Sequence, residues 1–284
     1  MNTNMTSHPD LHPEAKRAID NGALFVGGTS GGKDSLAMVA RLIEMGVPTS
    51  QMVLVHAHLG HIEWPGALEK AKEQAEMLGV PFIVARAKRN LLEIVRDRYE
   101  KRPDVPSWPS SSARYCTSDL KRGPIEREVR RYAKANGYKI VVSCMGLRAE
   151  ESPARKKRPV WSQNNRQTNS KREWFEYLPV HELSTEGVFA TIERAGLTPH
   201  WAYAEGNERL SCVYCIFGSV SDLQNGAKHN PDLAREYIEL EEALGWTMHM
   251  SRRPLAELLA ETVEKPLSLG VQVPCAEQLE LFAA

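Results

Sequence analysis

The stretch ALFVGGTSGGKDSLAMVARLI, residues 23–43, joins an apolar run to a helical pattern through a glycine-rich loop. Ala23–Gly27 has the composition of a buried strand, and Ser35–Ile43 that of a helix. The glycines between them let backbone amides approach an anion, and a helix N-terminus adds partial positive charge. Lys33 adds a full positive charge to the same loop. We therefore expect a phosphate group to bind between this strand and this helix.

Two types of phosphate loop fit parts of this stretch. Gly27 to Lys33 has the Gly-x4-Gly-Lys spacing of a Walker A loop, which continues with Ser or Thr as a magnesium ligand. Asp34 stands in that place, so we reject a Walker A loop. The segment resembles instead the PP-loop of ATP pyrophosphatases, with the pattern Ser-Gly-Gly-x-Asp-Ser, here Ser30-Gly31-Gly32-Lys33-Asp34-Ser35. The resemblance implies ATP as the ligand, with Asp34 either capping the helix or holding Mg²⁺.

Strands and helices alternate over the first half of the chain. We expect further strands at residues 52–56, 80–85 and 139–143, and helices at 65–78, 91–99 and 124–136. This alternation predicts an α/β fold with a doubly wound parallel sheet. Ligands of such sheets lie beyond the carboxyl ends of the strands, which here lead into residues 27–35, 56–63 and 146–155.

The pattern changes after about residue 151. Residues 154–172 contain seven basic residues and no acidic ones, and we expect a loop there. Helices are expected at 185–195, 231–244 and 254–263. We therefore divide the chain into an N-terminal segment, 1–20, a nucleotide-binding domain, 21–180, and a mainly helical, cysteine-bearing extension, 181–284.

Composition excludes several classes of protein. Lys+Arg and Asp+Glu are both 36, so a globally basic nucleic-acid binder is not indicated. No apolar run reaches membrane-spanning length, and Met1–Asp10 lacks the apolar core of a signal peptide. We expect a cytoplasmic protein with no membrane partner. Its five cysteines, an odd number, argue against a disulfide framework.

Four later motifs extend the resemblance to one branch of the PP-loop superfamily. They are His61–Gly66, Arg114–Pro124 with the pattern Cys-x4-Lys-x2-Pro, Gly146–Arg155 with Gly-x-Arg-x2-Glu-Ser-x2-Arg, and Tyr203–Cys215. In the last, Ser211 replaces a glycine of the family pattern. The branch contains the phosphoadenosine phosphosulfate reductases and the related DNA-phosphorothioation and tRNA-thiolation enzymes. The resemblance, from about residue 20 to 225, implies an adenine nucleotide alpha hydrolase-like fold.

The resemblance also implies roles for individual residues. His56, Glu63 and Gly146 would lie near the nucleotide. The cationic residues of the motifs would face the active site, where guanidinium and ammonium groups clamp phosphate or sulfate: Lys121, Arg148, Arg155 and Arg209. The paired spacing of His56, His58 and His61 also suggests a metal site, but polar side chains at a strand end near a nucleotide account for it better.

The cysteines allow several interpretations. Cys212-x2-Cys215 by itself fits buried thiols, a redox pair or part of a zinc site. Together with Cys116, these cysteines resemble the ligands of a 4Fe-4S cluster in cluster-bearing relatives. Three thiolates would leave one iron open, unless Cys144, Cys275 or a histidine supplied a fourth ligand. We expect Cys144 to be a core thiol, and Cys275 lacks the Glu-Cys-Gly context of a reductase nucleophile.

Two enzymatic functions fit these motifs. In the first, ATP adenylylates an oxygen of DNA or tRNA, and sulfur from a cysteine desulfurase-type donor replaces that oxygen. The basic stretch Arg155–Arg172 would then contact the polynucleotide backbone. In the second, a thiolate attacks adenylyl sulfate or its 3′-phosphorylated form and releases sulfite. A nucleotide-sensing module without turnover is a third alternative. We favour sulfur insertion into a nucleic acid.

Overall fold

The computed structural model describes residues 11–260. Its centre is a six-stranded sheet in the order β3-β2-β1-β4-β6-β5. The strands are β1 (Leu24–Thr29), β2 (Met52–His58), β3 (Phe82–Arg86), β4 (Ile140–Cys144), β5 (Trp161–Gln163) and β6 (Glu173–Tyr177). The four strands expected from the sequence correspond to β1–β4, and the predicted α/β fold is confirmed.

The order of the strands places a switch point beside β1. Strand β1 pairs in parallel with β2 on one side and with β4 on the other. Strand β6 continues the sheet in parallel with β4. In a doubly wound sheet, a ligand crevice forms between two adjacent parallel strands whose following connections run to opposite sides of the sheet. The loops that follow β1 and β4 are therefore the ones that should meet at a ligand.

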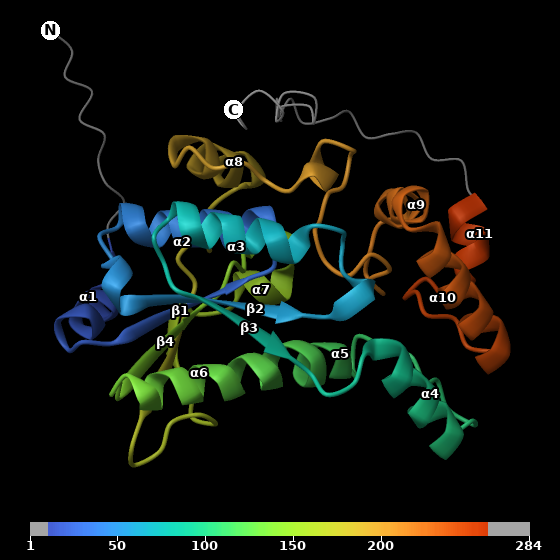
Figure 1. Cartoon of the computed structure of the whole chain (residues 1–284), viewed down its shortest axis with the longest axis horizontal. Coiled ribbons are helices and arrows are strands. Elements are labelled where there is room, and N and C mark those ends of the chain that lie inside the picture. The colour runs from blue at the N-terminus through green and yellow to red at the C-terminus, as the bar shows by residue number, and fades with distance from the viewer. Residues whose placement is uncertain (1–10, 261–284) are drawn as a thin grey trace, which may run out of the picture. The chain divides into compact units, whose positions relative to one another are not determined.

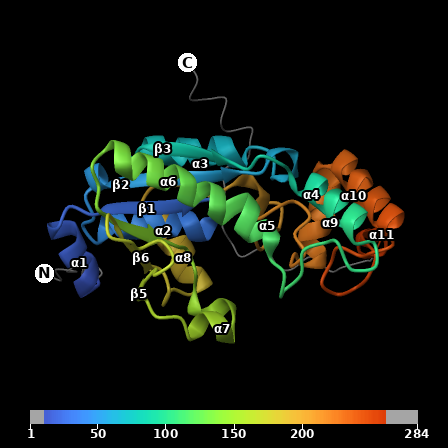
Figure 2. The same cartoon turned by 90° about the horizontal axis from the view of Figure 1, so that it is seen from below.

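Helices cover both faces of this sheet, as Figures 1 and 2 show: α2 and α3 lie over one face, and α6 over the other. The helices of the chain are α1 (Pro13–Asp20), α2 (Lys33–Glu44), α3 (Ala67–Met77), α4 (Leu91–Lys101), α5 (Tyr115–Thr117), α6 (Gly123–Ala135), α7 (Pro153–Lys156), α8 (Thr185–Arg194), α9 (Val220–His229), α10 (Pro231–Leu244) and α11 (Leu255–Ala260). Because side chains alternate along a strand, Phe25 packs in one core while Leu24 and Val26 pack in the other. Both faces being buried explains why these strands have continuous apolar runs.

The basic segment is more regular than predicted. We expected a loop over residues 154–172, but Trp161–Gln163 forms β5, which pairs antiparallel with β6. The rings of Trp161 and Phe175 stack across this pair with centroids 5.2 Å apart. A strand of three residues is too short to show alternation in the sequence, whereas the aromatic contact that stabilises it is made only after folding.

The described residues fall into two compact units that are interleaved along the chain. One contains the sheet and takes in residues 11–57, 68–85 and 123–197; the other takes in 58–67, 86–122 and 198–260. The division expected from the sequence, with boundaries at residues 20 and 180, consisted of consecutive segments instead. Each unit has a core of its own, and in the second unit it is built on residues such as Trp108, Tyr214 and Tyr237.

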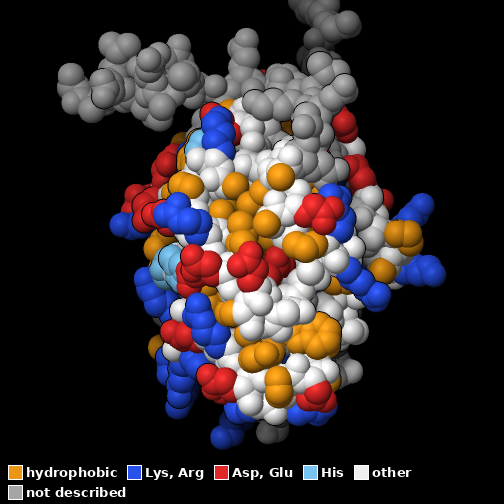
Figure 3. Space-filling view, turned by 90° about the vertical axis from the view of Figure 1, so that its right-hand side faces the viewer, with side chains coloured by type: hydrophobic (Ala, Val, Ile, Leu, Met, Phe, Trp, Pro, Cys, Tyr) orange, Lys and Arg blue, Asp and Glu red, His pale blue; other side chains and the backbone are white. Residues whose placement is uncertain are grey.

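The second unit is mainly helical. Our sequence analysis missed α9. Ser219 caps this helix by accepting a hydrogen bond from the Asp222 amide. Figure 3 looks onto the side of α10 and α11, where hydrophobic side chains gather among charged ones. Within residues 11–260, no helix combines the length and the apolar character needed to span a bilayer.

Candidate functional site

The PP-loop-like segment forms a tight turn between β1 and α2. Gly31 has φ 74°, a left-handed conformation that suits glycine. The Ser35 hydroxyl donates to the Gly32 carbonyl over 2.8 Å, and the Gly31 amide donates to Thr29 Oγ1 over 3.4 Å. Helix α2 then begins at Lys33 with no side-chain cap. The amides of this turn and the start of α2 form the kind of N-terminus that binds anions.

The charged groups of the loop contact one another. Lys33 is 5% exposed, and its Nζ lies 3.4 Å from Asp34 Oδ2. Arg148, from the loop after β4, donates from Nε to Asp34 Oδ1 over 2.7 Å. Asp34 thus forms ion pairs with two cations. Its side chain does not cap α2, which is one of the two roles that we considered for it. Burial lowers the pKa of Arg148, but Asp34 and Glu150 together outweigh it, so that the pKa of Arg148 is raised.

The loop after β4 also approaches the PP-loop-like turn through its backbone. A Cβ atom on Gly146 would lie 2.6 Å from the carbonyl oxygen of Asp34. No side chain fits at that distance, which explains the glycine. The structure therefore brings Gly146 and Arg148 to the phosphate loop at the switch point of the sheet, as the sequence predicted for this edge.

Arg155 belongs to the same unit but has an acidic partner. Its guanidinium pairs with Glu151, and its carbonyl oxygen lies 3.0 Å from Nε2 of His181. His181 is 5% exposed and holds this turn in place. The sequence analysis missed His181, because an isolated histidine after a strand has no motif around it.

The second unit brings together the three cysteines that we expected to bind iron. Cys116 lies in α5, and Cys212 lies opposite Glu63 in an antiparallel bridge, next to a hydrogen bond from the Val213 amide to the Ile62 carbonyl. All three cysteines are free thiols and partly exposed. The pKa of Cys212 is raised to about 11: burial raises it most, the charge of Lys121 lowers it, and the charges of Cys215 and Cys116 raise it.

Lys121 is the cation of this cysteine cluster. Its pKa is raised, most strongly by the charge on Cys212 and further by those on Cys215 and Cys116. Tyr237 adds a buried phenol: burial and then the charges on Cys212 and Cys215 raise its pKa well above the usual value. Its hydroxyl has no hydrogen-bond partner among the described residues.

This arrangement suits a cluster better than a single metal ion. One zinc ion with Zn–S bonds of about 2.3 Å draws its thiolates close together. Among residues 11–260, however, the three cysteines do not form a group gathered closely enough around one ion. An iron–sulfur cluster accepts thiolates that are further apart, and a lysine nearby offsets part of its negative charge. The residues present fit such a cluster.

One cysteine lies elsewhere, and another lies beyond the described residues. Cys144 is the last residue of β4 and is 1% exposed in the core, where burial raises the pKa of its thiol. It is a core thiol, as expected, and it belongs to the other unit. Cys275 is outside the described residues.

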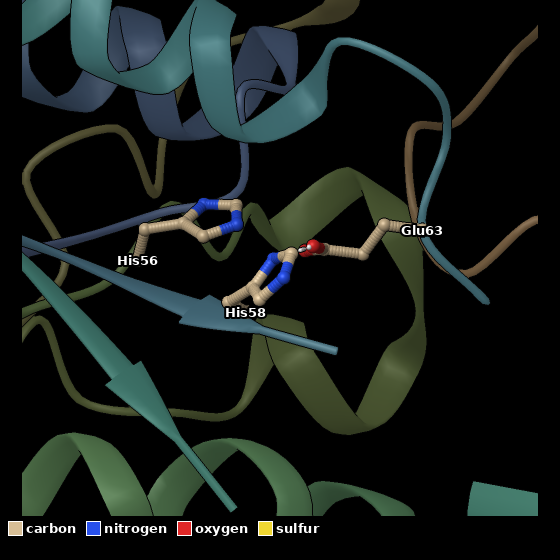
Figure 4. Close-up of side chains that lie close together, drawn as sticks. All are labelled: His56, His58 and Glu63. Carbon is tan, nitrogen blue, oxygen red and sulfur yellow. Dashed lines mark hydrogen bonds and ion pairs between the residues drawn. The ribbon is translucent and has the colours of Figure 1, made fainter. Parts of the chain in front are cut away.

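A different group of potential ligands lies at the end of β2. The ligand atoms of His56, His58 and Glu63 lie within 4.8 Å of one another, as Figure 4 shows. His58 Nδ1 is hydrogen-bonded to Glu63 Oε2 at 2.7 Å, and His56 Nδ1 lies 3.1 Å from the Thr29 carbonyl oxygen. The third histidine of the sequence pattern, His61, contacts Glu236 instead. The sequence could not show that Glu63, rather than His61, completes this group.

The remaining predicted contact residues are less enclosed. Arg209 is exposed on the second unit. In the basic stretch, three arginines have acidic partners, namely Arg155 with Glu151, Arg158 with Glu176, and Arg166 with Glu126. These pairs neutralise part of the charge that we expected to face a polynucleotide.

Residues 25–217 match the family model of the phosphoadenosine phosphosulfate reductase domain. The chain belongs to this family. The matched range contains the phosphate loop, Arg148 and all three clustered cysteines. The resemblance to this family stated from the sequence is thereby confirmed. No finer activity follows from family membership.

Individual relatives are distant. An uncharacterized 37.8 kDa protein in the gpa 5′ region of Escherichia phage 186 is 27% identical over 241 residues, covering 73% of this chain and 71% of its own. The phosphoadenylyl-sulfate reductase of Candida auris has a TM-score of 0.45 at 15% identity, covering 70% of this chain and 85% of its own. The U34-tRNA thiolase NcsA from Methanococcus maripaludis, with its [4Fe-4S] cluster, has a TM-score of 0.41 at 15% identity, covering 88% and 80%.

Proposed function

We propose that this family member is an ATP pyrophosphatase that activates a nucleic-acid acceptor by adenylylation, so that sulfur can replace an oxygen atom. The acceptor oxygen attacks the α-phosphorus of ATP, and pyrophosphate leaves. An external thiol reduces the persulfide of a desulfurase-type donor and is itself oxidised to a disulfide; the sulfide-level sulfur released then attacks the activated atom, and AMP leaves with the oxygen. The acceptor is DNA, as in phosphorothioation, or tRNA, as in thiolation.

The sheet unit supplies groups for the first half of this reaction. Backbone amides of the Ser30–Ser35 loop and the buried Lys33 would bind the phosphates and stabilise the pyrophosphate leaving group. Asp34 is held by Lys33 and Arg148 beside the loop, where its carboxylate would hold Mg²⁺. His56 and Gly146 would lie near the rest of the nucleotide. Arg155 and Arg209 are proposed as further anion contacts.

The second unit supplies groups for sulfur transfer. Cys116, Cys212 and Cys215 would hold a 4Fe-4S cluster, which would supply a binding site for the sulfur to be transferred. Lys121 would offset part of the negative charge of the three thiolates in a cluster. Glu63 bridges to Cys212 through the backbone and fixes the segment that bears it.

The observation that carries this proposal is the set of cysteines itself. Three free thiols interact with Lys121, whereas Cys144 is buried in the core of the other unit. Three cysteine ligands would suit a cluster that takes part in sulfur insertion. Reduction of a sulfonucleotide would need instead a separate, mobile nucleophilic thiol.

The deciding experiment compares the two reactions in protein purified without oxygen. With ATP, a sulfur donor and DNA or tRNA, we expect AMP and pyrophosphate only when the acceptor is present, together with a sulfur-bearing nucleoside detected by mass spectrometry. Cys275→Ser should leave this activity in place, and Cys212→Ser should abolish it. Release of sulfite from either adenylyl sulfate or its 3′-phosphorylated form, lost in Cys275→Ser, would show that the protein is a reductase.

A further inference from the structure

The second unit contains an arginine-lined pocket that none of the proposed steps uses. The pocket has a volume of about 520 Å³. It is lined by Arg98, Ala113, Arg114, Tyr115, Thr117, Ser118 and Arg122. Three guanidinium groups and no carboxylate thus surround one cavity, an arrangement that favours an anion with several oxygen atoms.

The charges of this arginine pocket are not neutralised by the protein. Within the described part of the chain, none of Arg98, Arg114 and Arg122 forms an ion pair. The arginines of the basic stretch differ, since Arg158 and Arg166 both have acidic partners. Three unpaired, exposed positive charges around one cavity make it attractive to an anion.

Aromatic rings hold two of these arginines in place. The guanidinium of Arg98 lies 4.5 Å from the ring centroid of Tyr115, and that of Arg114 lies 5.3 Å from the centroid of Phe217. The Tyr115 ring is itself fixed, because its hydroxyl donates to the Ser107 carbonyl over 2.6 Å. A guanidinium stacked on a ring keeps its N–H groups available for an anion and loses little freedom when it binds one.

A π-helical turn connects this pocket to the cysteine cluster. Residues Ser118–Arg122 form the turn, in which hydrogen bonds join residues five apart. This spacing brings Thr117 and Arg122 to one side of the segment and Cys116 and Lys121 to another. The pocket and the cluster therefore share one short segment, so that a strand held in the pocket would lie close to the thiols.

We propose that the arginine pocket binds phosphodiester groups in the backbone of the nucleic-acid acceptor. The identity of the ligand as an acceptor rests on the proposed function, whereas binding of a strand does not. Exposed arginines at an open pocket suit a backbone that passes across it, and bidentate contacts to phosphate need no particular base sequence. The pocket would position the acceptor, while the chemistry stays with the nucleotide and the cysteines.

The test is the affinity for a labelled single-stranded oligonucleotide and for a tRNA transcript, measured by fluorescence anisotropy at several salt concentrations. The variant carries Arg98→Gln, Arg114→Gln and Arg122→Gln. We expect affinity to fall at least about tenfold, and the slope of log affinity against log salt to decrease by about 2–3 because three phosphate contacts are lost. The single variant Arg122→Gln, with one exposed side chain changed, should give part of the loss.

A matched control removes the same charge from the same unit. Arg96, Lys101 and Arg235 all have acidic partners, and changing them to Gln should alter affinity by less than about twofold. Iron content and ATP affinity of the pocket variant should equal those of the wild type, which shows that it is folded.

Three results would overturn the proposal. The pocket variant could bind both strands like the wild type. It could lose affinity only for inorganic phosphate and bind the strands as before, which would mean that the ligand of the pocket is a small anion. Strand binding could be weakened instead by a triple variant of the basic stretch, Lys156→Gln/Lys157→Gln/Lys171→Gln. Strand binding that depends on the pocket, without any sulfur insertion, would contradict the proposed function and leave the pocket proposal standing.

Discussion

At the scale of residues, the phosphate loop depends on a balance of buried charge. Lys33 and Arg148 both contact the Asp34 carboxylate, and both cations are nearly buried. Two positive groups facing one carboxylate leave the loop with an excess of positive charge, which an ATP phosphate can offset. The charge of Lys33 would therefore be available to bind a phosphate as well as to pair with Asp34.

Lys33→Ala should accordingly weaken ATP binding by about 1–3 kcal/mol, the usual contribution of a charge-assisted contact. Isothermal titration calorimetry measures this loss directly. Lys156→Ala, which removes an exposed lysine of the same unit, serves as the control and should bind ATP like the wild type. An unchanged affinity in Lys33→Ala would mean that the phosphates bind elsewhere.

At the scale of elements, the loops after β1 and β4 touch through their backbones. Gly146→Ala would place a Cβ atom 2.6 Å from the Asp34 carbonyl oxygen, so one of the two loops must move. We expect a loss of stability of about 1–3 kcal/mol, as for other overpacked sites, and a weaker affinity for ATP. Thermal unfolding and ATP titration measure the two effects. Gly187→Ala is the control, since the nearest atom to its Cβ would be at 3.6 Å; equal effects of the two changes would refute this account.

Helix α10 is tied to the segment before α11 by one carboxylate. Glu241 is 7% exposed, and its carboxylate accepts hydrogen bonds from the amides of Met248 and Leu255. Glu241→Ala would leave both amides buried without a partner, at a cost of about 1–3 kcal/mol for each. Glu241→Gln keeps one accepting oxygen and should lie between this variant and the wild type in urea unfolding. Equal stability of Glu241→Ala and the wild type would mean that water reaches these amides.

At the scale of the whole molecule, the phosphate loop and the cysteine cluster belong to different compact units with separate cores. Damage to one site should therefore leave the other intact. Cys212→Ser should remove most of the iron and of the broad absorption near about 400 nm, while ATP affinity stays within about twofold. Lys33→Ala should show the opposite pattern.

Iron analysis, absorption spectra and ATP titration of the two variants make this comparison. Cys144→Ser is the control for the cysteines, since it changes a core thiol that takes no part in the cluster. It should lower stability and keep the iron. Colourless protein carrying stoichiometric zinc would show that the three cysteines do not hold an iron–sulfur cluster.

The sequence by itself determined the strands β1–β4, the α/β fold and the phosphate loop, because apolar runs, glycines and helix starts are local signals. The spacing of the family motifs also predicted that Cys116, Cys212 and Cys215 belong to one site. Only the tertiary structure decided what each charge faces: Arg148 contacts Asp34, Glu63 rather than His61 contacts His58, and three arginines of the basic stretch pair with acids. The interleaving of the two units and the arginine pocket are likewise features that only the tertiary structure shows. These contacts join residues far apart in the chain, and no local pattern encodes which partner a charged side chain reaches once the backbone has folded.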